Sequence, residues 1–293
     1  MNTAFLIIKP LGKTIFALLR LVRIGNVCMI TAGVYLGAFL VQGHALDFFS
    51  PLLLKAASAE ALLGAAGYVM NDLLDAPIDK VNRPSRPLVT GEITVLMAWV
   101  TFGVLLLGAV GLALSLTVSH QLIFLCTLCV LVAYNMWLSK LPLIGNLSIS
   151  AVVALAIPYG ALPFEWTPTI WIAAGFAFVT MLAREVVKDV EDVIGDRAGG
   201  ANTLPVLIGT EASVHWVHVL SIIVVLGSVL PYLIFDFGGL YLILISVTDL
   251  ILLLPISRTG NNSSSASFFS SSLKWAMLFG MVALSFANSV PTN

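Results

Sequence analysis

The segment Asn71-Asp72-Leu73-Leu74-Asp75-Ala76-Pro77-Ile78-Asp79 places three aspartates and one asparagine at the end of a long apolar run. A second acidic segment, REVVKDVEDVIGD at residues 184–196, also ends an apolar run. Together the two segments hold eight of the 15 carboxylates of the chain. The acidic side chains are therefore concentrated at two points, and the apolar sequence around them defines the fold.

Composition identifies the class of protein. Hydrophobic residues make up 59% of the 293 residues and charged residues 10%, whereas a soluble domain has roughly 45–50% and about 25%. The mean hydropathy is +1.03. The net charge of -1 excludes a strongly basic nucleic-acid-binding protein. We expect a multi-pass protein of the cell membrane, with no nucleic-acid partner and no obligatory protein partner.

Nine segments are long and apolar enough to be considered as membrane spans, since crossing takes about 20 apolar residues. We therefore predict an all-α membrane protein with a single integral-membrane domain over residues 1–293. The expected spans are 16–41, 52–73, 95–115, 121–138, 144–162, 170–187, 213–235, 240–255 and 273–289.

The distribution of basic residues predicts the orientation of these spans. If the N-terminus is cytoplasmic, 13 of the 14 Lys and Arg residues fall at cytoplasmic ends or connections, and Lys55 is the exception. Positive charge is enriched in cytoplasmic loops of membrane proteins. Both acidic segments then lie on the cytoplasmic side, where we expect the active site.

The spacing of the aspartates predicts a metal site. At about 100° per residue, spacings of three and four place each trio within one narrow arc of a helix. Such carboxylates repel one another unless a cation neutralises them, and clustered oxygen ligands suit Mg²⁺. One cluster alone is equally compatible with an acidic helix end that pairs with Arg and Lys, but the repeated spacing favours Mg²⁺. The two trios are Asp72, Asp75 and Asp79, and Asp189, Asp192 and Asp196.

A basic loop with a Pro/Gly turn follows each acidic segment, which indicates two related halves around one site. Arg83 and Arg86 lie in the first loop and Arg197 in the second. Carboxylate-bound Mg²⁺ with Arg and Lys would stabilise a departing diphosphate. An aromatic face would stabilise the carbocation left behind, and Tyr134 is the preferred candidate, although simple packing also explains it. Lys140 lies nearby, where it can reach a phosphate or merely set the topology.

An ion-coupled transporter is the non-enzyme alternative, because it also combines clustered carboxylates with an internally repeated helical bundle. Its acids tend to lie near the midplane, whereas these lie at span ends among Arg and Lys, which favours phosphate chemistry. Cys126 and Cys129 have metal-site spacing, but the sequence around them is apolar and holds no further ligand, so we expect buried, inert side chains.

At these residues the chain resembles the UbiA-type intramembrane prenyltransferases. NDLLDAPID matches the family motif NDxxDxxxD, NRPSRPL at residues 82–88 matches its NRPxRPL continuation, and residues 192–196 match DxxxD. The resemblance implies nine transmembrane helices around a central cavity and a cytoplasm-facing site for Mg²⁺ and diphosphate. It implies metal binding by Asn71, Asp72, Asp75, Asp79, Asp189, Asp192 and Asp196; diphosphate contacts from Arg23, Asn26, Arg83, Arg86, Lys140 and Lys188; and catalytic roles for Asp75, Asp192, Tyr134 and Lys140.

Within that family, the second acidic segment most resembles the archaeal digeranylgeranylglyceryl phosphate synthase branch. That branch transfers geranylgeranyl from its diphosphate to geranylgeranylglyceryl phosphate during ether-lipid synthesis. The tyrosine that the ubiquinone branch usually carries inside this motif is absent from residues 184–196. Prenylation of an aromatic acceptor such as 4-hydroxybenzoate, in a quinone, haem or chlorophyll pathway, stays open as the alternative.

Overall fold

The structure is a computed structural model that describes residues 11–258 and 263–287. All regular secondary structure in these ranges is helical. Nine of the described helices are long and apolar enough to cross a membrane, which confirms the expected number. They are α2 (Ile24–Gln42), α3 (Pro51–Leu74), α5 (Val95–Leu114), α6 (Val118–Met136), α7 (Ile144–Ala161), α8 (Pro168–Ala198), α10 (Thr210–Ser228), α12 (Gly239–Leu253) and α13 (Ser263–Ser285).

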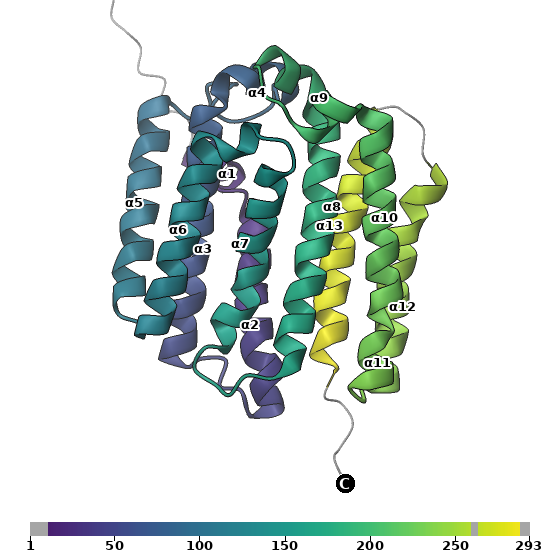
Figure 1. Cartoon of the computed structure of the whole chain (residues 1–293). Helices are drawn as coiled ribbons and strands as arrows, with labels where there is room; N and C mark the ends of the chain where they lie inside the picture. Colours follow the sequence, from purple (N-terminus) through teal and green to yellow (C-terminus); the bar gives the residue numbers. More distant parts are fainter. Residues whose placement is uncertain (1–10, 259–262, 288–293) are drawn as a thin grey trace, which may run out of the picture.

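The shorter helices lie at the two ends of the bundle. In Figure 1, α4 and α9 meet at the end where α3 and α8 finish. This end therefore collects both acidic segments. The shorter helices are α1 (Leu11–Leu21), α4 (Ala76–Asn82), α9 (Leu204–Ile208), α11 (Leu230–Ile234), and the 3₁₀ turns η1 (Gly43–Ala45), η2 (Leu138–Lys140) and η3 (Leu254–Arg258).

The nine long helices form two groups around a central set. Helices α3, α5 and α6 pack together on one side, and α10, α12 and α13 on the other (Figure 1). Between them, α7 packs against both α2 and α8. The halves that the sequence predicted therefore meet along α2, α7 and α8.

Two glycines set the close crossing of α2 and α7. A Cβ at Gly37 would lie 1.8 Å from the carbonyl oxygen of Ile157, and one at Gly160 would lie 1.8 Å from that of Val34. Only glycine permits such an approach of two backbones, which is a common basis of helix packing in membranes. The two halves are fixed to each other at this crossing.

Two expected helices are interrupted. The span predicted at 16–41 breaks around Arg23, where α1 gives way to α2. The first aspartate trio does not share one helix as predicted, because α3 ends at Leu74 and α4 begins at Ala76. Pro77 is the reason: it has no N–H to bond back to α3 and its ring clashes with the preceding turn. The second trio lies on the continuous helix α8, as predicted.

The outer surface of the bundle is apolar. Leu107 on α5 is 74% exposed and Leu122 on α6 is 63% exposed, as suits helices that face lipid. The expectation that Cys126 and Cys129 are buried was wrong, because both are exposed. A lipid-facing position accepts small apolar side chains as readily as a protein core does, so apolar sequence alone did not distinguish them.

Candidate active site

A polar cavity opens at the end of the bundle where α3, α4 and α8 meet. It has a volume of about 1210 Å³ and is lined by carboxylates, arginines and lysines from both halves of the chain. We call it the polar cavity. The convergence of residues more than 100 positions apart in the sequence is the main feature of the site.

Arginines neutralise part of the first acidic segment. Asp72 is 2% exposed and accepts hydrogen bonds from Arg23 at 2.7 Å and Arg86 at 2.9 Å. Arg86 also donates to Asp79. Asp72 lines neither the polar cavity nor the apolar cavity beneath it, and its contacts position the two arginines.

Arg83 joins the two acidic segments directly. It comes from the loop after α4, yet its Nε lies 3.0 Å from Asp192 Oδ1 and its Nη2 lies 2.7 Å from Glu191 Oε2, both on α8. Nη2 also donates to Asp192 Oδ2 at 3.1 Å. Such forked pairing to one carboxylate fixes both direction and distance. The Arg83 guanidinium therefore bridges the two halves across the mouth of the site.

Asn82 makes a second link between α4 and α8. Its side-chain oxygen accepts from the backbone N–H of Gly195 at 2.9 Å, and its amide donates to the carbonyl of Asp192 at 3.0 Å. A Cβ at Gly195 would lie 2.3 Å from the Asn82 oxygen. Sequence reasoning did not assign Asn82 a role, because its partners lie 110 and 113 residues away. Its only signal is its place directly before Arg83 in the NRP motif.

Three carboxylates in the polar cavity lack a cationic partner. In residues 11–258 and 263–287, no basic nitrogen lies within 4.0 Å of Asp75, Asp189 or Asp196. They accept hydrogen bonds from uncharged groups instead: Asn71 at 2.6 Å, Asn146 at 2.7 Å and Thr203 at 3.1 Å, respectively.

The electrostatics around Asp75 and Asp79 fit the binding of a cation. Burial raises the pKa of Asp75, although Arg86 and the Asn71 hydrogen bond oppose the rise. Burial also raises the pKa of Asp79 to about 6, again against Arg86. The positive charge of Arg86 therefore does not fully compensate for the desolvation of Asp75 and Asp79, and a bound divalent cation would add to that compensation.

The residues present fit Mg²⁺. The unpaired carboxylates and the Asn71 side chain offer oxygen atoms as ligands, and oxygen is the ligand atom that Mg²⁺ prefers. Among the described residues, no three acidic, His or Cys side chains converge into a complete ion cage. This is consistent with Mg²⁺, which takes one or two carboxylates and completes its shell with phosphate and water.

Arg23 reaches the site through an unusual backbone conformation. It has φ 52° and ψ 55°, the left-handed region that non-glycine residues rarely adopt. Its guanidinium donates to Asn71 at 2.9 Å and stacks over the Tyr68 ring, with the guanidinium carbon 4.9 Å from the ring centroid. The helix break thus places a cation at the boundary between polar and apolar surfaces.

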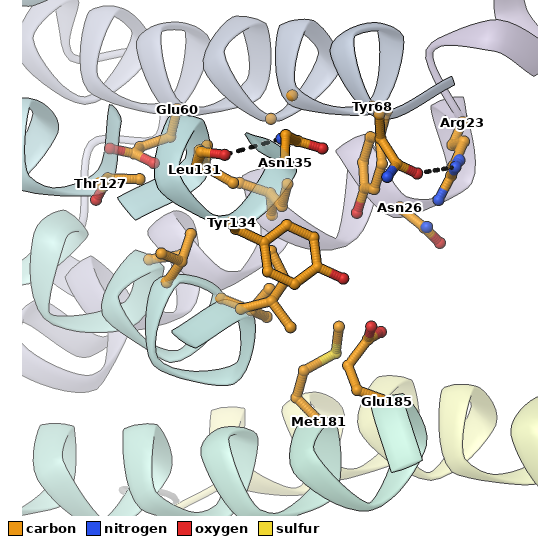
Figure 2. A pocket seen from close by; sticks show the side chains of 18 of the residues that line it. Arg23, Asn26, Glu60, Tyr68, Thr127, Leu131, Tyr134, Asn135, Met181 and Glu185 are labelled. Carbon is orange, nitrogen blue, oxygen red and sulfur yellow. Dashed lines mark hydrogen bonds between the residues drawn. The ribbon is translucent and has the colours of Figure 1, made fainter. Parts of the chain in front are cut away.

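Beneath the polar cavity lies an apolar one, between α2, α3, α6, α7 and α8. It has a volume of about 730 Å³, and we call it the central cavity. Figure 2 shows Arg23, Asn26 and Tyr68 at its polar end, Glu60 and Thr127 at its far end, and the Tyr134 ring between them. The family expectation of a central cavity is confirmed.

Two lysines differ in their contacts. Lys140 lines the polar cavity, and its carbonyl accepts from the backbone N–H of Asn202, which holds η2 against the chain after α8. Lys188 lines both cavities but donates to both oxygens of Glu185 at 2.8 Å. Glu185 is a buried carboxylate that sequence reasoning left out of the site.

The structure therefore brings the expected site residues together, with Asp72 set behind the lining. Their roles as ligands or catalytic groups stay predictions. The residues that line the polar cavity, the central cavity or both are Arg23, Asn26, Asn71, Asp75, Asp79, Arg83, Arg86, Tyr134, Lys140, Lys188, Asp189, Asp192 and Asp196.

This arrangement defines an intramembrane prenyltransferase: the chain belongs to the UbiA prenyltransferase family, whose model matches residues 30–281. It is similar to the digeranylgeranylglyceryl phosphate synthase of Sulfurisphaera tokodaii, with 35% identity over 82% of this chain and 86% of that protein. The synthase of the same name from Haloquadratum walsbyi is 33% identical, over 85% of this chain and 87% of that protein.

Solved structures share the fold. A structure described as a digeranylgeranylglyceryl phosphate synthase in membranes matches with a TM-score of 0.71 and 27% identity, over 94% of this chain and 98% of that one. A UbiA homologue from Archaeoglobus fulgidus, bound to GPP and Mg²⁺, matches with a TM-score of 0.67 and 20% identity, over 92% and 99%. The chain is a multi-pass membrane prenyltransferase.

Proposed function

We propose that the protein transfers the geranylgeranyl group of geranylgeranyl diphosphate to the free hydroxyl of geranylgeranylglyceryl phosphate. The relatives named digeranylgeranylglyceryl phosphate synthase support this acceptor, at 30–36% identity. One observation carries the chemistry: carboxylates and arginines from both halves meet directly above an apolar cavity. A charged diphosphate and an apolar chain fit these two environments.

The polar cavity binds the diphosphate of the donor. When Mg²⁺ is bound by the unpaired carboxylates Asp75, Asp189 and Asp196, it neutralises charge on the leaving diphosphate. Arg83 and Arg86 line the polar cavity, where each can exchange a carboxylate partner for a phosphate oxygen of the donor. Arg23 holds the end nearest the central cavity.

The transfer breaks one bond and forms another. The C1–O bond of the donor breaks, and the diphosphate leaves with its electron pair. The Tyr134 ring faces the cavity where positive charge develops on the allylic carbon, and an aromatic face stabilises such a cation. The acceptor hydroxyl oxygen then bonds to C1, and its proton passes to the departing diphosphate. The apolar walls exclude water, which would otherwise capture the cation.

We further propose that this site faces the cytoplasm, with the N-terminus on the same side. The distribution of 13 of the 14 Lys and Arg residues supports this orientation.

The test is transfer of radiolabelled geranylgeranyl in membranes, with and without Mg²⁺, offering geranylgeranylglyceryl phosphate and 4-hydroxybenzoate in parallel. We expect Mg²⁺-dependent labelling of the glyceryl phosphate alone. Labelling of the aromatic acid alone would assign the protein to the quinone branch instead, and labelling of neither would reject both acceptors.

A further inference from the structure

A second apolar cavity lies in the C-terminal half of the bundle and has no role in the mechanism above. It has a volume of about 520 Å³ and is bounded by α2, α7, α8, α10, α12 and α13. We call it the C-terminal cavity. Neighbouring residues separate it from the central cavity: Ala156 and Met181 line the central cavity, while Ile157 and Thr180 line the C-terminal one. The protein thus offers two apolar spaces on opposite sides of α7 and α8.

Two cations lie about one helical turn beyond residues that line the C-terminal cavity. Arg184 follows Thr180 by four residues on α8, and Lys274 precedes Met277 by three on α13. Residues three or four apart share a helix face. Thr180 and Met277 line the cavity, so both cations lie on cavity-lining faces, about one turn nearer the acidic segments.

The positive charge of this pair is not fully compensated. Arg184 lies 3.5 Å from Glu185 Oε1, but both oxygens of Glu185 already accept from Lys188. The Arg184 Nε is buried with no hydrogen-bond partner among the described residues. Within the same ranges, no carboxylate lies within 4.0 Å of Lys274, and Arg184 repels it. An anion is the missing partner.

The pair also adjoins the reacting region. Arg184 lines both the polar and the central cavity. Lys274 lies against Gly25: its Nζ is 3.3 Å from the position that a Cβ on Gly25 would occupy. The next residue, Asn26, lines both the polar and the central cavity. An anion held by Arg184 and Lys274 would therefore lie at the border of the polar and central cavities, where the donor is proposed to bind.

We propose that Arg184 and Lys274 bind the phosphate of the acceptor, and that the C-terminal cavity holds the acceptor's geranylgeranyl chain. This inference rests on the proposed function, because it assumes an acceptor with a phosphate, an apolar chain and a hydroxyl between them. Phosphate contacts orient such a molecule so that its hydroxyl faces the central cavity. Each of the two prenyl chains then has its own space, and each phosphate group its own cations.

The phosphate assignment is tested with Lys274→Met and two acceptors, geranylgeranylglyceryl phosphate and the dephosphorylated geranylgeranylglycerol. A charged hydrogen bond contributes enough to affinity that its loss raises the KM about tenfold. We expect this rise for the phosphorylated acceptor, an unchanged KM for the donor, and an unchanged kcat/KM for the dephosphorylated acceptor. Lys274→Arg should restore the wild-type KM. Lys80→Met, at an exposed position on α4, is the matched control. It should change neither the KM for the phosphorylated acceptor nor the KM for the donor.

The outcomes separate the two proposals. If the wild type labels neither acceptor, the proposed function fails and this inference fails with it. Suppose that the wild type labels the phosphorylated acceptor, but that Lys274→Met lowers kcat/KM by the same factor for both acceptors. The anion bound by Arg184 and Lys274 is then not the acceptor phosphate. A membrane-lipid headgroup at the same cations would give that second result. In that case the proposed function stands and the phosphate assignment is overturned.

The cavity assignment is tested with Ala177→Phe, because Ala177 lines the C-terminal cavity on α8. The larger side chain fills space needed by a twenty-carbon chain. We expect a several-fold lower kcat/KM with the geranylgeranyl acceptor, little change with an acceptor that carries a ten-carbon geranyl chain, and an unchanged donor KM. A raised donor KM, or an equal loss with both acceptors, would overturn the assignment.

Discussion

At the residue scale, the carboxylates of the site fall into two kinds. Arg86 contacts Asp72 and Asp79, and Arg83 contacts Asp192. The Asp75 carboxylate accepts a hydrogen bond from Asn71, and no Arg or Lys nitrogen of the described residues lies within 4.0 Å of it. Pairing with arginine keeps repelling carboxylates together before any substrate binds. The proposed metal ligands are the unpaired carboxylates together with Asp79, whose burial Arg86 does not fully compensate.

Removal of one carboxylate from each segment should abolish transfer. We expect Asp75→Ala and Asp192→Ala each to lower kcat at least about 100-fold, as loss of one group that stabilises a developing charge does. The measurement is geranylgeranyl transfer at saturating Mg²⁺, with thermal unfolding in detergent as the check on folding. Glu211→Gln, an exposed carboxylate on α10, is the control. Full activity in either alanine variant would contradict the two-segment site.

The raised pKa of Asp79 predicts how Mg²⁺ dependence changes with pH. Its pKa is about 6, above the ordinary value for aspartate, so the carboxyl gains a proton as the pH falls through 6. A protonated carboxyl does not bind metal, so protons compete with Mg²⁺. We expect the Mg²⁺ concentration for half-maximal activity to rise up to about tenfold between pH 6 and 5. Asp79→Asn should weaken this dependence; an unchanged dependence in that variant would contradict the role of Asp79.

At the element scale, α4 and the residue that follows it connect the first acidic segment to α8. Asn82 and Arg83 make contacts to α8 from adjacent positions. Pro77 makes this possible, because it ends α3 and lets α4 turn toward α8. The helix break that sequence periodicity missed is therefore part of how the two acidic segments meet.

The Asn82 link should affect activity more than folding. We expect Asn82→Ala to lower kcat about tenfold, because Asp192 loses its fixed position, while the bundle stays folded. Asn202→Ala is a matched control, since that side chain is exposed and only its backbone contacts Lys140. Equal activity of the two variants would show that the link is dispensable.

The crossing of α2 and α7 should determine stability instead. Gly37→Ala would bring a Cβ within 1.8 Å of the Ile157 carbonyl oxygen, and overpacking of this kind costs about 1–3 kcal/mol. At Gly103, on α5, a Cβ has open space within 4 Å, and Gly→Ala in a helix is favourable by up to about 1 kcal/mol. We expect a lower Tm for Gly37→Ala and an equal or higher one for Gly103→Ala, measured in detergent. An unchanged Tm for both would contradict the close crossing.

The sequence predicted the elements better than their contacts. Hydropathy was sufficient for nine spans, since burial in lipid depends on local composition. Aspartate spacing predicted a metal site from helical periodicity, which is also local; the periodicity holds for the second trio on α8 but not for the first, which the break before α4 divides. The bridge from Arg83 to Asp192 spans 109 residues, and no periodicity encodes which distant side chains meet. Asp72 illustrates the same limit: its spacing matches the other aspartates, but its two arginine contacts place it behind the cavity.

At the scale of the whole molecule, the site lies where the two halves meet, and α7 and α8 divide the apolar interior into two cavities. Charge is concentrated at one end of this interior. Donor and acceptor can therefore both place their phosphates at the same end while their chains occupy separate spaces.

The final prediction concerns the orientation of the whole molecule. The described ranges hold nine apolar helices long enough to span a membrane, and an odd number of spans puts the start of the first and the end of the last on opposite sides. The proposed orientation, with the basic residues inside, puts the start of α2 on the cytoplasmic side and the end of α13 outside. In a bacterial host, alkaline phosphatase is active only after export, whereas green fluorescent protein fluoresces when it folds in the cytoplasm. We expect phosphatase activity from a fusion after residue 293 and fluorescence from a fusion before residue 1. Phosphatase fused instead between residues 199 and 203, beside the second acidic segment, should be inactive; activity there would place the site outside the cell and reverse the orientation.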